Sequence, residues 1–215
     1  MTVRRIRVAV VVYGLLAIGA VLWGTVAGRL DLYHHPEPWV QWAFPQRTLL
    51  SLVLGVGVAV VAIAATRLLV RRTRWARRLH VEFRSLFGPL GSAEIAVFAL
   101  ASGVAEELFF RGAMQPDAGL VVTSLAFGLL HILPRAWPWT LWAIVMGFVF
   151  GTLHAVTGAL LAPLVAHVVI NYENLHFINS YDPSPPSGSD DRSRRREPSE
   201  PDLVSTRLRT GGRTR

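Results

Sequence analysis

The chain has 215 residues, 52% of them hydrophobic, and a formal net charge of +8. That composition is too apolar for an ordinary soluble domain, and the apolar residues come in blocks rather than in amphipathic stripes. No cysteine is present, so neither disulfides nor thiol chemistry can contribute. From the blocks of apolar residues we expect a membrane protein.

Six apolar blocks along the chain predict its fold. The first two, residues 8–27 and 48–70, each supply the roughly 20 residues that a bilayer crossing needs. The first is longer than the apolar part of a signal peptide, so we expect it to be a retained helix. The fold class expected is all-α: a polytopic transmembrane bundle of about six membrane helices with a buried active site. The other blocks lie at about 93–113, 119–134, 138–154 and 158–178.

The placement of the arginines predicts the orientation. Three precede the first block, whereas the loop at 29–47 carries Asp31 and Glu37 beside its two arginines. By the positive-inside rule the N-terminus and the 71–84 loop are cytoplasmic, and six crossings return the C-terminus to that side. The basic residues then contact lipid headgroups, and no nucleic-acid partner is expected. Seven arginines lie at or beyond the end of the second block: Arg67, Arg71, Arg72, Arg74, Arg77, Arg78 and Arg84.

Composition also divides the chain into parts. Residues 71–92 are expected to be an Arg-rich connector, because Gly and Pro at its end interrupt a helix. After Tyr181 the sequence turns to Pro, Ser, Asp, Glu and Arg, which predicts a disordered cytoplasmic tail over 182–215. Residues 1–181 are then the integral membrane domain, with the motif-bearing core at about 93–175.

The third block carries Glu106, Glu107 and Arg111. An ionisable side chain in mid-bilayer costs roughly 2.5–3.5 kcal/mol, so such residues usually face an interior cavity and mark function. Glu107 and Arg111 are four residues apart and can pair, whereas Glu106 is turned about 100° away. Glu106 is thus left free to act as a general base. An ion-paired cluster that only fixes helix packing stays open.

Two further polar pairs with the same spacing follow. Phe127 and His131 share a face of the fourth block, and His167 and Asn171 share a face of the sixth. The second pair can donate hydrogen bonds to an oxyanion, although it can equally join two helices. At 1.5 Å per residue, Glu106, His131 and His167 all fall roughly 10–20 Å from the cytoplasmic face. Their common depth predicts one site.

The remaining histidines and the tryptophans near position 140 receive structural interpretations. His34, His35 and His80 are expected in loops, and His154 and His176 near helix ends. The tryptophans predict an interfacial aromatic belt and not a substrate-binding surface. They are Trp137, Trp139 and Trp142.

The ordered motifs E-E-x-x-x-R, F-x-x-x-H and H-x-x-x-N resemble those of the CPBP (or Abi) family of intramembrane glutamic endopeptidases, which includes the type II CAAX prenyl proteases. The resemblance covers about residues 93–175. Its matching residues are Glu106, Glu107, Arg111, Phe127, His131, His167 and Asn171.

By this resemblance, Glu106 and His131 activate a water for peptide hydrolysis, and His167 and Asn171 form the oxyanion hole. The second glutamate of the first motif and its arginine hold the charge and geometry of the site. The reaction implied is metal-free, without cofactor or acyl-enzyme. The sequence contains no H-E-x-x-H, although a Glu/His/His zinc site stays open geometrically.

The function expected is an intramembrane endopeptidase in the bacterial inner membrane that cleaves a membrane-anchored protein or peptide. Relatives of the resembled family suggest sorting tails, lipidated proteins or bacteriocin-like peptides as substrates, and the sequence does not choose among them. Two alternatives stay open. One is a non-catalytic membrane scaffold or bacteriocin-immunity-type protein with the same motifs, and the other is a small transporter.

Overall fold

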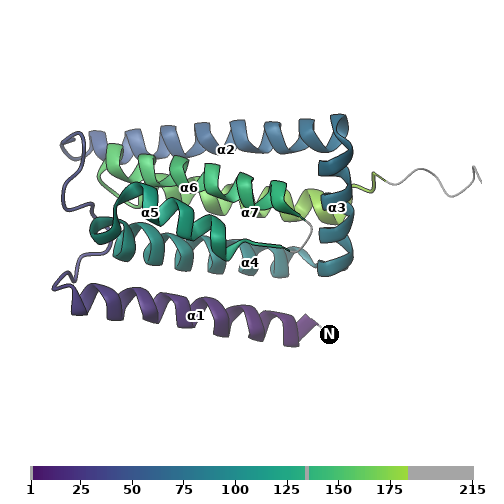
Figure 1. The fold of residues 1–215 in the computed structure, drawn as a ribbon, viewed down its shortest axis with the longest axis horizontal. Helices are drawn as coiled ribbons and strands as arrows, with labels where there is room; N and C mark the ends of the chain where they lie inside the picture. Colours follow the sequence, from purple (N-terminus) through teal and green to yellow (C-terminus); the bar gives the residue numbers. More distant parts are fainter. Residues whose placement is uncertain (1, 134–135, 184–215) are drawn as a thin grey trace, which may run out of the picture. The chain divides into compact units, whose positions relative to one another are not determined.

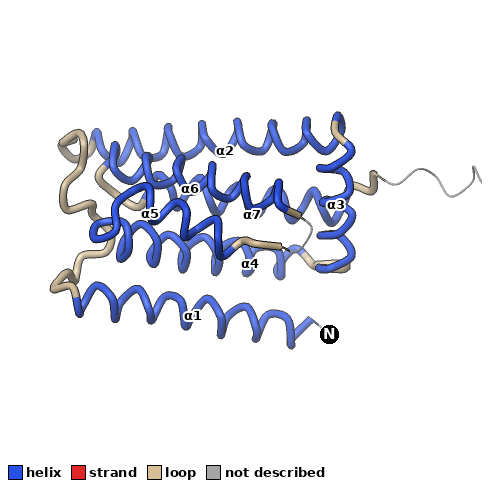
Figure 2. Tube along the Cα trace, viewed as in Figure 1, coloured by secondary structure: helices blue, strands red, loops and turns tan. Residues whose placement is uncertain are grey.

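Helices make up most of the part of the chain that the computed structural model describes, residues 2–133 and 136–183 (Figures 1 and 2). Within these ranges no strand is present, which confirms the expected all-α fold. Each of the six apolar blocks corresponds to a helix, and the third continues into a π-helical segment, η1. The elements are α1 (Thr2–Val26), α2 (Gln46–Arg72), α3 (Arg74–Phe87), α4 (Ser92–Glu107), η1 (Leu108–Met114), α5 (Gln115–Leu130), α6 (Trp137–Thr157) and α7 (Leu161–Ser180).

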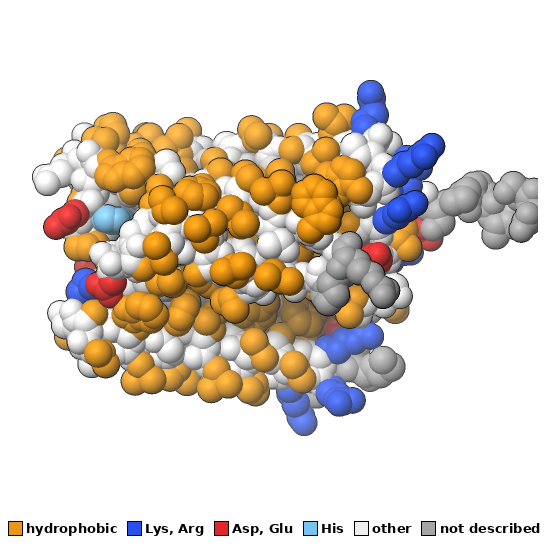
Figure 3. All heavy atoms as spheres, viewed as in Figure 1, with side chains coloured by type: hydrophobic (Ala, Val, Ile, Leu, Met, Phe, Trp, Pro, Cys, Tyr) orange, Lys and Arg blue, Asp and Glu red, His pale blue; other side chains and the backbone are white. Residues whose placement is uncertain are grey.

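The long helices are those of a membrane protein. In the described residues three spans are long and apolar enough to cross a bilayer: Arg4–Val26, Gln46–Arg72 and Trp137–Thr157. The first two turn much of their valine and leucine outward, and apolar side chains cover much of the face in Figure 3. A water-soluble protein rarely exposes so continuous an apolar surface, whereas lipid tails solvate it without cost.

The helix α3 corrects the prediction of an irregular connector at 71–92. It crosses the end of the bundle at a steep angle to the other helices (Figure 1). Thr73 caps its first turn by accepting from the Ala76 N–H, and it ends at Gly88, whose φ of 61° suits glycine. Its inner face buries Ala76 and His80. Three arginines are exposed on its outer face: Arg74, Arg77 and Arg78. The many arginines hid this amphipathic pattern from the sequence analysis.

Two contacts fasten α3 to the end of α7. The His80 ring donates from Nε2 to the Tyr181 carbonyl at 2.9 Å, so this histidine lies in a buried helical position and not in a loop. Arg84 donates to the carbonyl oxygens of Ile178 and Asn179 at 2.9 and 2.8 Å. These bonds satisfy carbonyl groups that the end of α7 leaves free, and they fix α3 across the bundle end.

Candidate active site

The first motif lies where α4 widens into η1. Glu107 and Arg111 are both fully buried, and Arg111 Nη1 donates to Glu107 Oε1 at 3.0 Å, so the expected pair is present. Arg111 also donates from Nη2 to the Gly147 carbonyl. Its guanidinium lies over the rings of Phe127 and Phe150, at 4.4 and 5.3 Å from their centroids. Ion pairing and cation–π contacts together compensate a charge that water cannot reach.

Glu106 faces a different set of partners. Its Oε2 lies 3.7 Å from His131 Nε2 and 3.9 Å from His167 Nε2. Both distances exceed that of a direct hydrogen bond, and no group in the described ranges donates one to this oxygen. Glu106 also borders the cavity described below, where a water can supply the missing hydrogen bond. Glu106 is therefore the carboxylate that remains free for chemistry.

His131 is held in one orientation at the C-cap of α5. Its Nδ1 is 2.7 Å from the Phe127 carbonyl, which can only accept, so Nδ1 carries the proton. Nε2 is consequently the ring nitrogen that faces Glu106. The ring packs on that of Phe127, with centroids 4.6 Å apart, and meets the edge of Trp139 at 6.0 Å.

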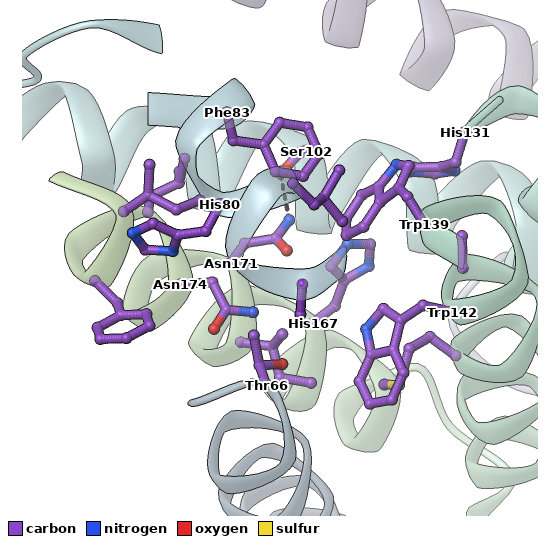
Figure 4. Close-up of a pocket in the computed structure, with 18 of the residues that line it drawn as sticks. Thr66, His80, Phe83, Ser102, His131, Trp139, Trp142, His167, Asn171 and Asn174 are labelled. Atoms are coloured by element: carbon purple, nitrogen blue, oxygen red, sulfur yellow. Dashed lines mark hydrogen bonds between the residues drawn. The ribbon is translucent and has the colours of Figure 1, made fainter. Parts of the chain in front are cut away.

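His167 and Asn171 approach the same point from α7. His167 Nδ1 donates to Glu107 Oε1 at 2.6 Å, and its ring stacks on Phe150. Asn171 Nδ2 donates to Ser102 Oγ at 2.9 Å, and this bond uses one of its two amide hydrogens (Figure 4). Sequence analysis missed Ser102, although it lies four residues before Glu106 on the same face of α4.

A close approach of α4 and α7 brings these groups together. A Cβ placed on Gly103 would lie 2.6 Å from Val168 Cγ2, so only glycine lets the two backbones come this near. Gly103 follows Ser102, and Val168 follows His167. All seven predicted site residues therefore belong to one cluster, formed by α4, η1, α5 and α7.

The cluster lies at one end of a cavity of about 340 Å³ that extends toward α3. Glu106, His131, His167 and Asn171 all line it, and Figure 4 shows several of these side chains around the same space.

Several aromatic and histidine positions need correction. Trp139 and Trp142 line the cavity instead of forming an interfacial belt, whereas Trp137 is 72% exposed. His154 is fully buried rather than at an interfacial helix end, and its ring packs near that of His35. What these side chains contact depends on the packing of the helices, which their positions in the sequence do not show.

The cluster also bears on the zinc alternative. In residues 2–133 and 136–183, no group of three or more His, Asp or Glu side chains is arranged to hold a metal ion. The Nδ1 atoms of His131 and His167 are occupied by Phe127 and Glu107, and their Nε2 atoms face Glu106. Metal-bound histidines make the same Nδ1 contacts, so these bonds do not discriminate between a hydrogen-bonded cluster and a ligand set.

Comparison with known proteins agrees with the motifs. Residues 89–172 match the family "Type II CAAX prenyl endopeptidase Rce1-like". The chain is also 30% identical over 123 residues to the uncharacterized protein YpbD of Bacillus subtilis (strain 168), which covers 54% of this chain and 63% of that relative. No solved structure matches significantly.

The matched range contains all seven motif residues, from Glu106 to Asn171, and leaves out α1, α2 and α3. The chain spans less than two thirds of the relative's length. The protein is therefore a membrane protein whose residues 89–172 form a domain of the Rce1-like family of type II CAAX prenyl endopeptidases.

Proposed function

We propose that the protein is an intramembrane, metal-independent endopeptidase that cleaves a membrane-anchored protein or peptide. The observation that carries this proposal is the division between two adjacent carboxylates. Glu107 is neutralised by Arg111, whereas Glu106 Oε2 lies near two histidine nitrogens at the edge of a cavity that has room for a water. A water held there has a base beside it and room for a peptide carbonyl.

In the proposed reaction Glu106 takes a proton from the water while His131 Nε2 accepts the other hydrogen and orients the nucleophile. The hydroxide oxygen bonds to the peptide carbon, and the carbonyl oxygen becomes an oxyanion. When the C–N bond breaks, the proton on Glu106 passes to the leaving amine. No covalent enzyme intermediate forms, because the attacking oxygen comes from water.

The oxyanion would be stabilised from α7. The second amide hydrogen of Asn171 is available, since Ser102 takes only one. His167 can donate from Nε2 when its ring is an imidazolium, because Nδ1 already donates to Glu107. An imidazolium together with Arg111 balances the two carboxylates, so the buried cluster is then formally neutral, as a low-dielectric site requires.

The substrate is sought by comparing the membrane proteomes of strains carrying the wild-type protein and the Glu106→Gln variant. We expect one or a few precursors to accumulate uncleaved in the variant, and a Glu37→Gln strain, altered in an exposed loop, to match wild type. Equal proteomes in all three strains, with the variant correctly inserted, would favour a non-catalytic scaffold instead.

We further propose that the protein lies in the bacterial inner membrane with α3 and both termini on the cytoplasmic side. The support is the gathering of arginines at the α3 end of the bundle, while the loop with Asp31 and Glu37 lies at the other end (Figures 1 and 3). Such asymmetry sets orientation by the positive-inside rule.

The absence of natural cysteine makes this orientation directly testable. A membrane-impermeant maleimide added to intact cells should label Glu37→Cys and leave Arg77→Cys unlabelled until the cells are opened. Both positions are exposed, so burial cannot explain a difference. The opposite pattern would mean that the protein is inserted the other way round.

A further inference from the structure

The catalytic cavity has two walls of different origin. One carries Glu106, His131 and His167 and falls within the matched range 89–172. The facing wall comes from α2, α3 and the last turns of α7, all outside that range. Its members are Thr66, Leu69, Val70, Trp75, Ala76, Leu79, His80, Phe83, Phe87, Asn174, Leu175, Phe177 and Ile178. The chemistry and the surroundings of a bound ligand are thus set by separate parts of the chain.

Asn174 is the unusual residue of this second wall. It lies three residues beyond Asn171 on α7, and Figure 4 places its side chain between those of Asn171 and Thr66. Its Oδ1 is buried, and no group in the described part of the chain donates a hydrogen bond to it. Thr66 does not supply one, since its hydroxyl donates to the Ala62 carbonyl. A buried acceptor without a donor is costly unless a ligand supplies the missing N–H or O–H.

The rest of the wall is aromatic and apolar, and it adjoins two tryptophans of the matched range. Phe83 of α3 meets Trp139 of α6 edge to face, with ring centroids 5.0 Å apart, and Trp142 of α6 also lines the cavity. Among the described residues that line the cavity, Glu106 is the only Asp, Glu, Lys or Arg side chain. Such a space accepts a large uncharged side chain and penalises a charged one, which would lose its water without gaining a partner.

We propose, on the basis of the function above, that this second wall selects the substrate. Asn174 Oδ1 accepts a hydrogen bond from a backbone N–H of the peptide, near the bond to be cut. The aromatic side chains of α3 and α6 hold a large apolar side chain of the same segment. An extended peptide can present both groups at once, because successive backbone N–H groups and side chains point in alternating directions. The substrate class is therefore a peptide with a bulky apolar residue close to the scissile bond.

The test uses the full-length protein in proteoliposomes and pools of quenched fluorescent peptides. Each pool fixes one position as Leu, Phe, Asp or Arg and randomises the others. Wild type should cut the Leu and Phe pools at least about tenfold faster than the charged pools. Asn174→Leu should raise KM about tenfold with kcat unchanged, the loss expected for one hydrogen bond, and Asn174→Gln should recover part of it. Phe83→Ala should weaken the apolar preference, whereas Leu86→Ala, on the exposed side of the same helix, should not.

The outcomes separate the two proposals. Equal cleavage of all pools, or an unchanged KM in Asn174→Leu, would overturn the proposal that the second wall selects the substrate. If Glu106→Gln abolishes that same cleavage, the endopeptidase proposal stands. No cleavage of any pool by wild type, together with no precursor accumulating in the Glu106→Gln strain, removes both.

Discussion

Replacing Glu106 by Gln is expected to lower kcat for peptide cleavage in proteoliposomes by roughly a thousandfold, the size of a general-base contribution, with KM nearly unchanged. The amide has the shape of the carboxylate but cannot take a proton from water. Since the Glu106 side chain makes no hydrogen bond or ion pair closer than 3.7 Å within residues 2–133 and 136–183, we expect the substitution to leave the packing of α4 intact. The measurement is initial rate against concentration for the Leu and Phe peptide pools.

A matched comparison makes this result specific. Glu107→Gln removes the carboxylate of the next residue in the chain. Unlike Glu106→Gln, it breaks the contacts to Arg111 and His167. We expect it to lower both the folded yield and kcat, whereas Glu106→Gln lowers kcat alone. Full activity in a well-folded Glu106→Gln protein would exclude Glu106 as the base.

Replacing Arg111 by Met is expected to lower the free energy of unfolding by about 3–5 kcal/mol, the cost of leaving one partner of a buried ion pair uncompensated. Glu107 stays fully buried in that variant and, of its two partners among the described residues, keeps only His167. The contacts of the guanidinium with Phe127 and Phe150 are lost as well. Denaturant unfolding in detergent micelles, followed by circular dichroism, measures the change.

Two controls test the cause of that loss. Arg67→Met breaks a half-exposed pair with Glu173 on the surface and should cost about 1 kcal/mol or less. The double variant Arg111→Met with Glu107→Gln removes both buried charges and should recover part of the stability. If the double variant is as unstable as the sum of its parts, ion pairing is not what holds this region together.

The site was largely predictable because its motifs repeat one spacing. A separation of four residues puts two side chains on one face, so Glu107 with Arg111 and His167 with Asn171 follow from helix geometry alone. The similar depths expected for Glu106, His131 and His167 in the membrane then predicted that their helices share one site. Whether Glu106 and its neighbours act as the resemblance implies stays a prediction for the experiments above.

What the sequence concealed depends on contacts between distant segments. The helix α3 was hidden because arginines dominate its composition, and only its packing on α7 shows which face is buried. Trp139 and Trp142 have the composition of an interfacial belt, and their place in the cavity follows from Phe83, about fifty residues earlier. The tail at 182–215, predicted to be disordered, lies almost entirely outside the described residues.

The π-helical turns of η1 have a consequence for how the two glutamates differ. A π-helix carries more residues per turn than an α-helix, and it commonly arises from one extra residue in an α-helix. Each residue of an α-helix turns the chain by about 100°, which is also the angle between Glu106 and Glu107. Removing one of residues 108–110, which lie between Glu107 and Arg111, would turn α4 by that angle relative to Arg111. The number of residues between the glutamates and Arg111 thus decides which glutamate is paired with the arginine and which faces the cavity.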